Sequence, residues 1–301
     1  MGHREEQRPR DGVLSCTLDP PGRRAGDVPS VSEGPIACER REERGPFDII
    51  GDVHGCYDEL VELLGKLGYR LEQRQGAGPR AYPPPGRKAV FVGDLVDRGP
   101  DVAGVLELVM AMVEAGQALA VLGNHDYKLL RALRGRNVKI AHGLQHSLQQ
   151  LGAQPAGFRA QVADFLAGLP TYYILDEGRL VVAHAGLKEE LQGKASARAR
   201  GFALFGETTG ETDAYGLPVR LDWAQHYHGR ALVVHGHVAV LEPRWVNNTI
   251  DIDTGCVFGG ALTALRYPEL ELFQVPAHRT YYEPIRPLGP PVPMETQAEH
   301  A

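Results

Sequence analysis

Five apolar segments of this sequence each run directly into Asp, Asn or His. Apolar runs of this length that stop at a glycine or a polar residue predict short buried strands. Ligands of open α/β sheets collect at the carboxyl ends of the strands, so the repetition predicts one polar site built from strand ends. The five are 47–50 before Gly51-Asp52-Val53-His54, 90–92 before Gly93-Asp94, 120–122 before Gly123-Asn124-His125, 180–183 before His184, and 232–234 before His235-Gly236-His237.

Helical patterns separate the first three of these segments. Leucines at helical spacing follow Asp58-Glu59, and a second apolar helical pattern follows Pro100-Asp101. The first half of the chain is therefore predicted as β-α-β-α-β. The expected strands are 47–50, 88–92, 118–122, a hairpin of 172–175 with 179–183, and 231–234, 249–253, 261–267 and 271–275. The expected helices are 58–67, 101–115, 127–133 and a helical stretch over 141–168, and residues 74–87 are predicted as a loop.

The two ends of the chain differ from its centre. Residues 1–45 are rich in Arg, Glu, Gly and Pro without a hydrophobic period, which predicts a disordered leader or, alternatively, a charged interaction arm. Residues 46–283 form the expected domain, and 284–301 a Pro-rich tail that is extended or disordered. Within the domain, the polar segment 188–230 is predicted to be an insert that caps the site or selects the substrate.

Composition narrows the possible partners. The net charge of −6 over 301 residues argues against a general nucleic-acid-binding surface. The apolar run around residues 102–113 is interrupted by Glu107, so no membrane span is expected. The sequence begins without the apolar core of a signal peptide, and its 4 cysteines form no C-x-x-C pair. We therefore expect reduced thiols and a cytoplasmic location.

The polar residues at the strand ends suit a pair of divalent cations. Two such ions about 4 Å apart can activate a water molecule and clamp a phosphate, and they require one bridging carboxylate. The predicted ligands are Asp52, His54 and Asp94 for the first ion, and Asp94, Asn124, His184 and His237 for the second, with Asp94 shared. Nitrogen and oxygen donors without a thiolate suit Mn, Fe, Ni or Zn and do not choose between them. Mn²⁺ is the first expectation, with Ni²⁺, Fe and Zn²⁺ as alternatives.

Further residues near these ligands could handle a phosphoryl group. Arg98 lies four residues after Asp94 and could bind phosphate oxygens with both arms of its guanidinium. His125 follows Asn124 and could protonate the leaving group, with Asp97 holding it in its charged form. Asn124 is also expected to contact substrate. Arg220 is either a second phosphate-binding group or a surface arginine that packs on Trp223.

The motifs G-D-x-H-G, G-D-x-x-D-R-G, G-N-H-[DE], a later His and G-H resemble, in this order, those of the calcineurin-like metallophosphoesterases. The resemblance covers residues 47–275 and points to the branch that contains the Ser/Thr phosphoprotein phosphatases. It implies an α/β fold of four layers, α/β/β/α. It also implies catalytic roles for Arg98 and His125, importance for Asp253, and metal-ligand roles for Asp52, His54, Asp94, Asn124, His184 and His237.

The segment from Trp245 to Gly260 is similar to two bacterial groups of this family, the PrpE-type bis(5′-nucleosyl)-tetraphosphatases and the phosphatase module of polynucleotide kinase-phosphatases. The chain contains no G-x-x-x-x-G-K-[ST] phosphate loop, so the kinase module is absent from it. Ala239 stands where other metallophosphoesterases carry the second histidine of G-H-x-H, as in the phosphoprotein phosphatase branch.

The resemblance makes a hydrolase of a dinucleoside polyphosphate, such as diadenosine tetraphosphate, the first expectation. The alternatives are a Ser/Thr or Tyr protein phosphatase, a polynucleotide 2′,3′-phosphatase, and a non-enzymatic phosphate-binding scaffold with a decayed site. Against decay, all six predicted metal ligands are present in the chain.

Overall fold

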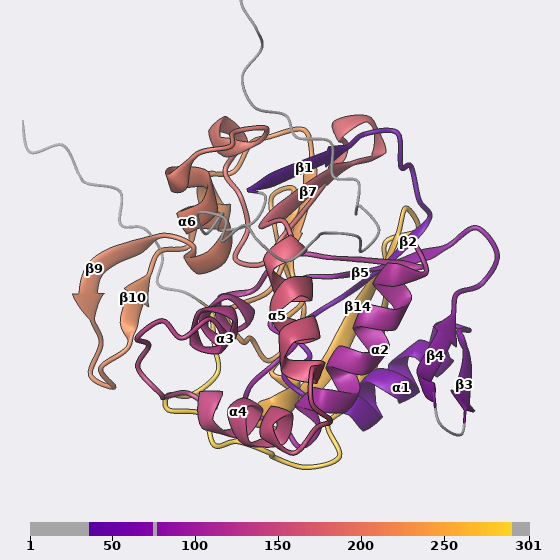
Figure 1. Ribbon diagram of the computed structural model, residues 1–301. Helices are drawn as coiled ribbons and strands as arrows, with labels where there is room; N and C mark the ends of the chain where they lie inside the picture. The colour runs from indigo at the N-terminus through magenta and orange to yellow at the C-terminus, as the bar shows by residue number, and fades with distance from the viewer. Residues whose placement is uncertain (1–35, 75–76, 291–301) are drawn as a thin grey trace, which may run out of the picture.

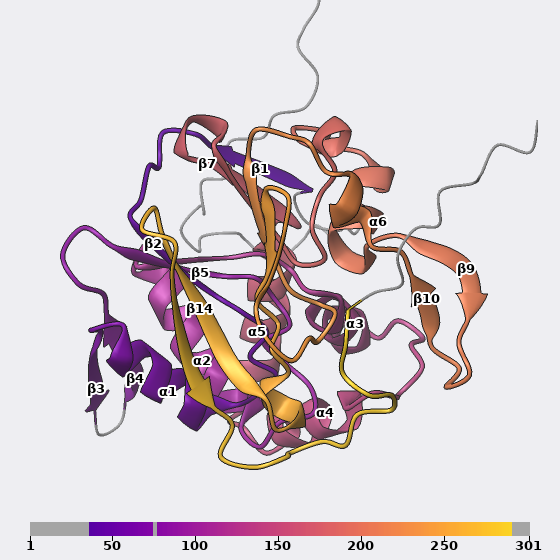
Figure 2. The same ribbon diagram turned by 180° about the vertical axis from the view of Figure 1, so that it is seen from behind.

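The computed structural model describes residues 36–74 and 77–290, which form two β-sheets packed face to face with helices on the outer faces (Figures 1 and 2). One sheet has five strands in the order β15-β14-β2-β5-β6. The bounds are β15 Glu271–Pro276, β14 Ala261–Tyr267, β2 Phe47–Ile50, β5 Lys88–Phe91 and β6 Ala118–Ala120. Because β2, β5 and β6 are parallel, their carboxyl ends lie at one edge.

The other sheet has six strands in the order β1-β7-β8-β11-β13-β12. The bounds are β1 Ala37–Arg40, β7 Tyr172–Leu175, β8 Leu180–Ala183, β11 Leu232–His235, β13 Thr249–Asp251 and β12 Arg244–Val246. Strands β8, β11 and β13 run parallel, so the residues that follow β8 and β11 emerge side by side. The predicted β7–β8 hairpin is present, turned at residues 176–178.

Successive side chains along each strand point to opposite faces of the sheet and so join two different apolar cores. Ile49 of β2 and Val90 of β5 point into an apolar core between the sheets, where they meet residues such as Val182 of β8. Their neighbours Ile50 and Phe91 point the other way and join the core under the helices. Every strand residue of β2, β5, β8 and β11 except Lys88 is buried, as expected for parallel strands covered on both faces.

The helices form the two outer layers. Five of them share the core on the outer face of the five-stranded sheet: α1 Tyr57–Lys66, α2 Val102–Glu114, α3 Asn124–Leu133, α4 Leu144–Gly152 and α5 Phe158–Gly168. Helix α6 (Ala197–Phe205) covers the opposite sheet, where Phe202 and Trp223 pack with Val233 of β11. This arrangement confirms the four-layer prediction.

Three segments differ from the sequence-based expectations. Strand β1 lies inside the segment predicted as a disordered leader, pairs with β7, and has Cys38 buried against the central core. The predicted loop 74–87 contains β4 (Ala77–Tyr82), which pairs with β3 (Arg70–Arg74). The polar insert 188–230 holds α6 and a hairpin of β9 (Thr208–Thr212) with β10 (Pro218–Arg220). Backbone pairing at sheet edges needs little hydrophobic periodicity, so these strands left a weak sequence signal.

The remaining predictions about the ends concern residues 1–35 and 291–301, which lie outside the described residues. No helix in the part of the chain that the structure describes is long and apolar enough to cross a membrane. Cys56 and Cys256 are buried free thiols, in line with the expectation of reduced thiols, and Cys16 lies outside the described residues. The cytoplasmic location stays a prediction.

Candidate dinuclear metal site

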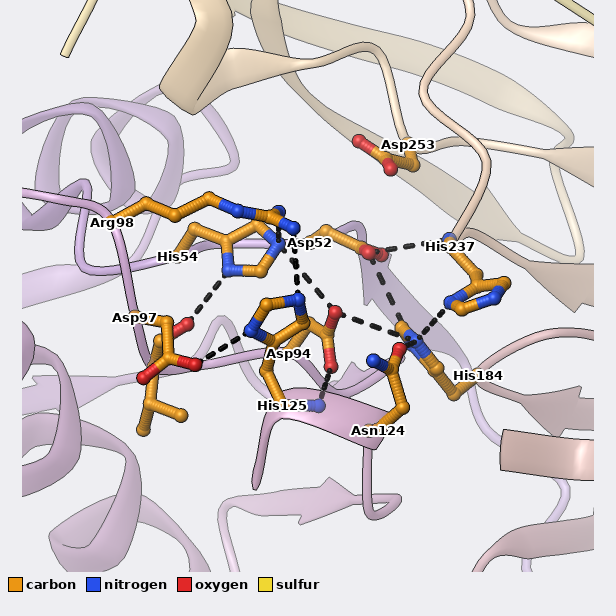
Figure 3. Close-up of polar contacts among 12 residues, drawn as sticks. Asp52, His54, Asp94, Asp97, Arg98, Asn124, His125, His184, His237 and Asp253 are labelled. Carbon is orange, nitrogen blue, oxygen red and sulfur yellow. Dashed lines mark hydrogen bonds and ion pairs between the residues drawn. The ribbon is translucent and has the colours of Figure 1, made fainter. Parts of the chain in front are cut away.

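The predicted ligands converge at the edge where the two sheets meet. Asp52 and His54 follow β2, Asp94 follows β5, Asn124 begins α3 after β6, His184 follows β8, and His237 follows β11. Figure 3 shows Asp94 between two groups of side chains, with His54, Arg98 and His125 on one side and Asn124, His184 and His237 on the other. Six positions spread over 186 residues of sequence, from 52 to 237, therefore form one cluster.

Asp94 lies at the centre of this cluster. Its Oδ2 atom is 3.5 Å from Nε2 of His54 and 3.5 Å from Nε2 of His184. Ligand atoms of Asp94, His184 and His237 all lie within 4.8 Å of one another, as do those of Asp94, His54 and His125. One carboxylate thus faces two sets of imidazoles, which is the arrangement that a shared ligand between two cations requires.

Ligand atoms of Asn124, His184 and His237 lie close together. Nε2 of His184 lies 2.9 Å from Oδ1 of Asn124 and 2.9 Å from Nδ1 of His237. An amide oxygen and two ring nitrogens with their lone pairs directed at one point are ligands that a divalent cation accepts. The structure therefore brings together the set predicted for the second ion.

Backbone carbonyls fix the orientation of two ligand histidines. Nδ1 of His54 lies 2.7 Å from the carbonyl oxygen of Val96, and Nδ1 of His184 lies 3.2 Å from that of Val92. A carbonyl can only accept, so each Nδ1 carries the proton and each Nε2 presents a lone pair to the cluster. Such outer contacts are characteristic of metal-binding histidines.

Asp52 provides the test of whether a cation fits. Its Oδ2 atom accepts a 3.2 Å hydrogen bond from the backbone N–H of His237, whereas its buried Oδ1 atom has no partner among the described residues. Nε2 of His237 is likewise buried without a partner there. Buried polar atoms are normally satisfied, so an unpartnered carboxylate oxygen beside these imidazoles fits a metal site.

The electrostatics of the cluster also favour a cation. Burial, followed by the charges of Asp253 and Asp94, raises the pKa of Asp52 well above its usual value. Burial lowers the pKa of His184 to about 3 and that of His237 well below the usual value. The histidines are therefore neutral, as metal ligands must be, and the clustered carboxylates need a positive charge for compensation.

Backbone strain is concentrated at this site. Of the ten described non-glycine residues with positive φ, five belong to the predicted site: His54, Asp94, Asp97, Arg98 and His237. Such conformations are costly and persist where the surroundings enforce them, which is common at functional sites. The strain supports an arrangement selected for chemistry.

Two glycines of the motifs allow close approach to the carboxylates. A Cβ atom on Gly123 would lie 2.2 Å from Oδ1 of Asp94, and one on Gly236 would lie 2.1 Å from Oδ1 of Asp52. Both distances are far below van der Waals contact. The glycines of G-N-H and H-G-H are therefore required by packing against the ligands.

Arg98 and His125 occupy one side of the cluster, as predicted. Arg98 donates from Nη1 to Nε2 of His54 at 2.6 Å and from Nη2 to Nε2 of His125 at 2.8 Å. Nδ1 of His125 lies 2.6 Å from Oδ2 of Asp97. The carboxylate thus holds the ring so that its Nε2 atom faces the same space as the guanidinium.

Sequence reasoning missed two residues that position this group. Ser147 of α4 donates to Oδ1 of Asp97 at 2.5 Å and accepts from the backbone N–H of Asp97 at 2.9 Å. Asp126 accepts 3.0 Å hydrogen bonds from the backbone N–H groups of Leu95 and Gly123, which ties together the loops after β5 and β6. The acidic residue of G-N-H-[DE] was visible in the motif, whereas nothing near Ser147 indicated its contact.

Asp253 lies apart from the histidines, next to Asp52 (Figure 3). Its Oδ1 atom accepts a 3.0 Å hydrogen bond from the backbone N–H of Gly255, and burial raises its pKa to about 6. The carboxylate also lines a cavity beside the cluster. The structure therefore places Asp253 at the edge of the site, in contact with a ligand.

A cavity of about 230 Å³ opens from the cluster. Arg98, Asn124, His125 and His237 form its inner end, and Arg220 of β10 lies in its wall. The Arg220 side chain donates to the carbonyl oxygen of Phe205 at 2.6 Å, while Trp223 packs its ring on Phe202, Tyr227 and His235. The location of Arg220 favours the phosphate-binding alternative over that of an exposed surface arginine.

A cluster of nitrogen and oxygen ligands that share a buried carboxylate, next to an arginine and a histidine, defines a metal-dependent phosphohydrolase. The chain belongs to the calcineurin-like phosphoesterase family, whose model matches residues 45–241.

Curated relatives have high identity over most of their length. The chain is 47% identical over 246 residues to a bis(5′-nucleosyl)-tetraphosphatase PrpE [asymmetrical] of Anoxybacillus flavithermus, covering 80% of this chain and 98% of the relative. It is 44% identical over 249 residues to the protein of the same name from Bacillus cereus, covering 81% and 99%. A crystal structure provisionally named as a diadenosine tetraphosphatase aligns with a TM-score of 0.58 and 28% identity, over 81% of this chain and 98% of that one.

Proposed function

We propose that this protein is a bis(5′-nucleosyl)-tetraphosphatase that hydrolyses diadenosine tetraphosphate or a close analogue asymmetrically with two divalent metal ions, Mn²⁺ in the first instance. The observation that carries the proposal is the convergence of two ligand groups on Asp94, next to Arg98 and His125 at the end of a cavity. The names of relatives at 44–47% identity support the substrate.

When bound, the metal ions would lower the pKa of a water molecule and stabilise the charge that develops on the phosphoryl oxygens. Asp52, His54 and Asp94 would hold one ion, and Asp94, Asn124, His184 and His237 the other. The protein's part is to keep the histidines neutral and oriented, which burial and the carbonyl contacts of His54 and His184 achieve. Burial raises the pKa of Asp52 and Asp94, so the bound cations would keep these carboxylates ionised.

Arg98 and Asn124 would bind the phosphate under attack. The guanidinium of Arg98 makes its hydrogen bonds to ring nitrogens, and none of the ion pairs among the described residues uses it. An anion that enters this space offers better acceptors than neutral imidazoles, so the guanidinium can turn to the phosphoryl oxygens. Arg220 extends this positive surface into the cavity wall.

His125 would protonate the departing phosphate oxygen from Nε2. Burial and then the charge of Arg98 lower the pKa of His125 well below its usual value, so the ring is neutral here and not charged as the sequence predicts. Asp97 accepts the proton of Nδ1 and would stabilise the charged ring once a phosphate draws Arg98 away, and Ser147 orients Asp97. Asp253, beside Asp52, would support the orientation of that ligand. These are positioning roles for Asp97, Ser147 and Asp253 and a direct role for His125.

The test is a comparison of specific activities of the Mn²⁺-loaded protein on diadenosine tetraphosphate, a phosphopeptide and a 2′,3′-cyclic nucleotide. We expect the first to dominate by at least about a hundredfold, with one nucleoside triphosphate and one monophosphate formed per turnover. A dominant phosphopeptide rate would favour the protein phosphatase alternative, and a dominant cyclic-nucleotide rate the polynucleotide phosphatase. A purified protein without bound metal and without activity on any of the three would indicate a scaffold.

A further inference from the structure

The chain beyond β15 returns across the opening of the cavity. The backbone N–H groups of Tyr281 and Tyr282 both donate to the carbonyl oxygen of Val257 at 3.0 Å, and that of Gly289 donates to Ala239 at 3.1 Å. Residues 281–289, hereafter the tail segment, are thus attached at both ends beside the metal site. Figure 2 shows this yellow segment passing below α4 and rising toward β10.

An ion pair connects the tail segment to the insert. Nη1 of Arg286 lies 3.2 Å from Oδ2 of Asp213, in the turn between β9 and β10. The cavity wall accordingly includes Leu217, Pro218 and Arg220 from the hairpin and residues 284–288 from the tail segment. Two surface elements that sequence analysis treated separately therefore enclose one cavity.

The charged side chains that line this cavity are three arginines and one carboxylate, Asp253. Arg98, Arg220 and Arg286 all line it. Burial, and then the nearby charge of Arg286, lowers the pKa of Arg220 to about 10, so its guanidinium remains charged at neutral pH. Arg286 shares its charge with Asp213, but Arg220 makes none of the ion pairs among the described residues. An anion longer than a single phosphate would relieve this repulsion.

The lining of the cavity also contains apolar side chains. Ile285 is 45% exposed although it lines the cavity, and Leu288 and Phe258 lie beside it. Phe258 packs against Tyr282 with ring centroids 6.5 Å apart. A flat apolar ligand such as a nucleobase would cover this exposed surface, and aromatic and aliphatic walls are characteristic of such sites.

We propose that the tail segment and the β9–β10 hairpin form a subsite for the part of the substrate remote from the cleaved bond, where Arg286 and Arg220 bind the distal phosphates and Ile285 with Leu288 holds one nucleobase. The inference rests on the proposed function and names the groups that select a nucleoside polyphosphate over a simple phosphoester. The tail segment is then a determinant of substrate choice.

The first experiment measures kcat/KM of Arg286→Ala for diadenosine tetraphosphate and for p-nitrophenyl phosphate. The ratio of the two values should fall about tenfold, because only the longer substrate reaches the lost hydrogen bonds. Arg279→Ala is the matched control, since Arg279 is an exposed arginine of the same strand-to-tail connection and lies outside this cavity. An unchanged ratio in Arg286→Ala would overturn the proposal.

Asp213→Asn separates phosphate binding from a structural role of the ion pair. If Arg286 only fastens the tail segment, removing its partner should lower the ratio as much as Arg286→Ala does. If Arg286 binds phosphate, the ratio should stay within about twofold of the wild-type value or rise, since a partly exposed ion pair contributes little and the guanidinium is retained. Equal losses in both variants would contradict the proposal.

Ile285→Ser tests the apolar wall. It should weaken competitive inhibition by a methylene-bridged, non-hydrolysable diadenosine tetraphosphate about fivefold, but leave inhibition by inorganic tripolyphosphate unchanged. Leu272→Ser, at another exposed apolar residue (40% exposed), serves as the control. Equal effects on both inhibitors, or none on either, would contradict the proposal that Ile285 and Leu288 hold a nucleobase.

These inhibition measurements use p-nitrophenyl phosphate as the reporter, which keeps the two proposals distinguishable. Wild-type protein that is inhibited by the analogue but does not cleave diadenosine tetraphosphate would contradict the proposed function and leave the subsite supported. Wild-type protein that cleaves diadenosine tetraphosphate, with Arg286→Ala and Ile285→Ser indistinguishable from it, would retain the function and refute the subsite.

Discussion

The cluster of predicted metal ligands and the wall of the cavity are built from different parts of the fold. The ligands follow strands of the two packed sheets, and their side chains are mostly buried and oriented by backbone contacts. The cavity wall comes from a hairpin and a tail segment outside both sheets, joined to each other through the ion pair of Arg286 with Asp213. Under the two proposals above, the chemistry belongs to residues held by the packed sheets, and substrate choice to segments that can vary without disturbing the sheets.

The largest effect is expected for Asp94→Asn. Loss of the shared carboxylate should lower kcat/KM at least about a thousandfold for diadenosine tetraphosphate and p-nitrophenyl phosphate alike, because both depend on the cluster. Steady-state kinetics with the two substrates in excess Mn²⁺ is the measurement. A loss confined to one substrate would mean that the division between cluster and cavity wall is wrong.

His125→Ala should be nearly as damaging but dependent on the leaving group. We expect kcat for diadenosine tetraphosphate to fall about a hundredfold or more, with a smaller loss for p-nitrophenyl phosphate, whose leaving group needs no proton. Metal content should stay at the wild-type value. Equal losses on the two substrates, or loss of metal, would instead assign His125 to metal binding.

Arg220→Ala tests the boundary between the two regions. Arg220 lies in the cavity wall yet close enough to Asp94 for the charges to interact, so both substrates should lose activity. The expected loss in kcat/KM is about tenfold for p-nitrophenyl phosphate and larger for diadenosine tetraphosphate. An unaffected variant would restore the alternative that Arg220 serves only to pack the insert.

The smallest effect is expected for Ser147→Ala. Without this hydroxyl, Asp97 orients His125 less well, and kcat should fall about fivefold to tenfold, while KM and the overall fold remain. Ser196→Ala is the matched control, because its hydroxyl accepts from the backbone N–H of Ala199 and caps α6. That variant should lose about 1 kcal/mol of stability and keep its activity. A Ser147→Ala variant that loses stability but keeps its kcat would show that Ser147 does not position Asp97 for catalysis.

The sequence predicted the cluster well because each ligand lies within a few residues of a strand end. Strands such as β2 and β5 are short and uniformly apolar, and the glycines beside the ligands mark where the chain turns. The local sequence pattern therefore predicted the positions of the clustered residues, and the family resemblance predicted the four-layer arrangement. The contact between Asp97 and His125 was also predictable, because each residue lies in a loop that directly follows one of two neighbouring strands.

The sequence could not predict contacts between distant polar segments. β1 belongs to a stretch with the composition of a disordered leader, yet backbone pairing with β7 and burial of Cys38 order it. Residues 284–301 are predicted to be extended or disordered because of their prolines, whereas the path of the tail segment over the cavity depends on backbone hydrogen bonds to Val257 and Ala239. Such bonds leave no side-chain pattern, so neither they nor the pairing of Ser147 with Asp97 could be anticipated.

The most direct test of the shared-carboxylate site is the metal content of the protein after saturation with Mn²⁺ and removal of free ion. The account predicts two Mn²⁺ ions per wild-type chain and at most one in Asp94→Asn, with activity restored to the wild type, and not to the variant, when metal is removed by a chelator and added back. Wild-type protein that binds no ion, or an Asp94→Asn variant that still holds two, would contradict it.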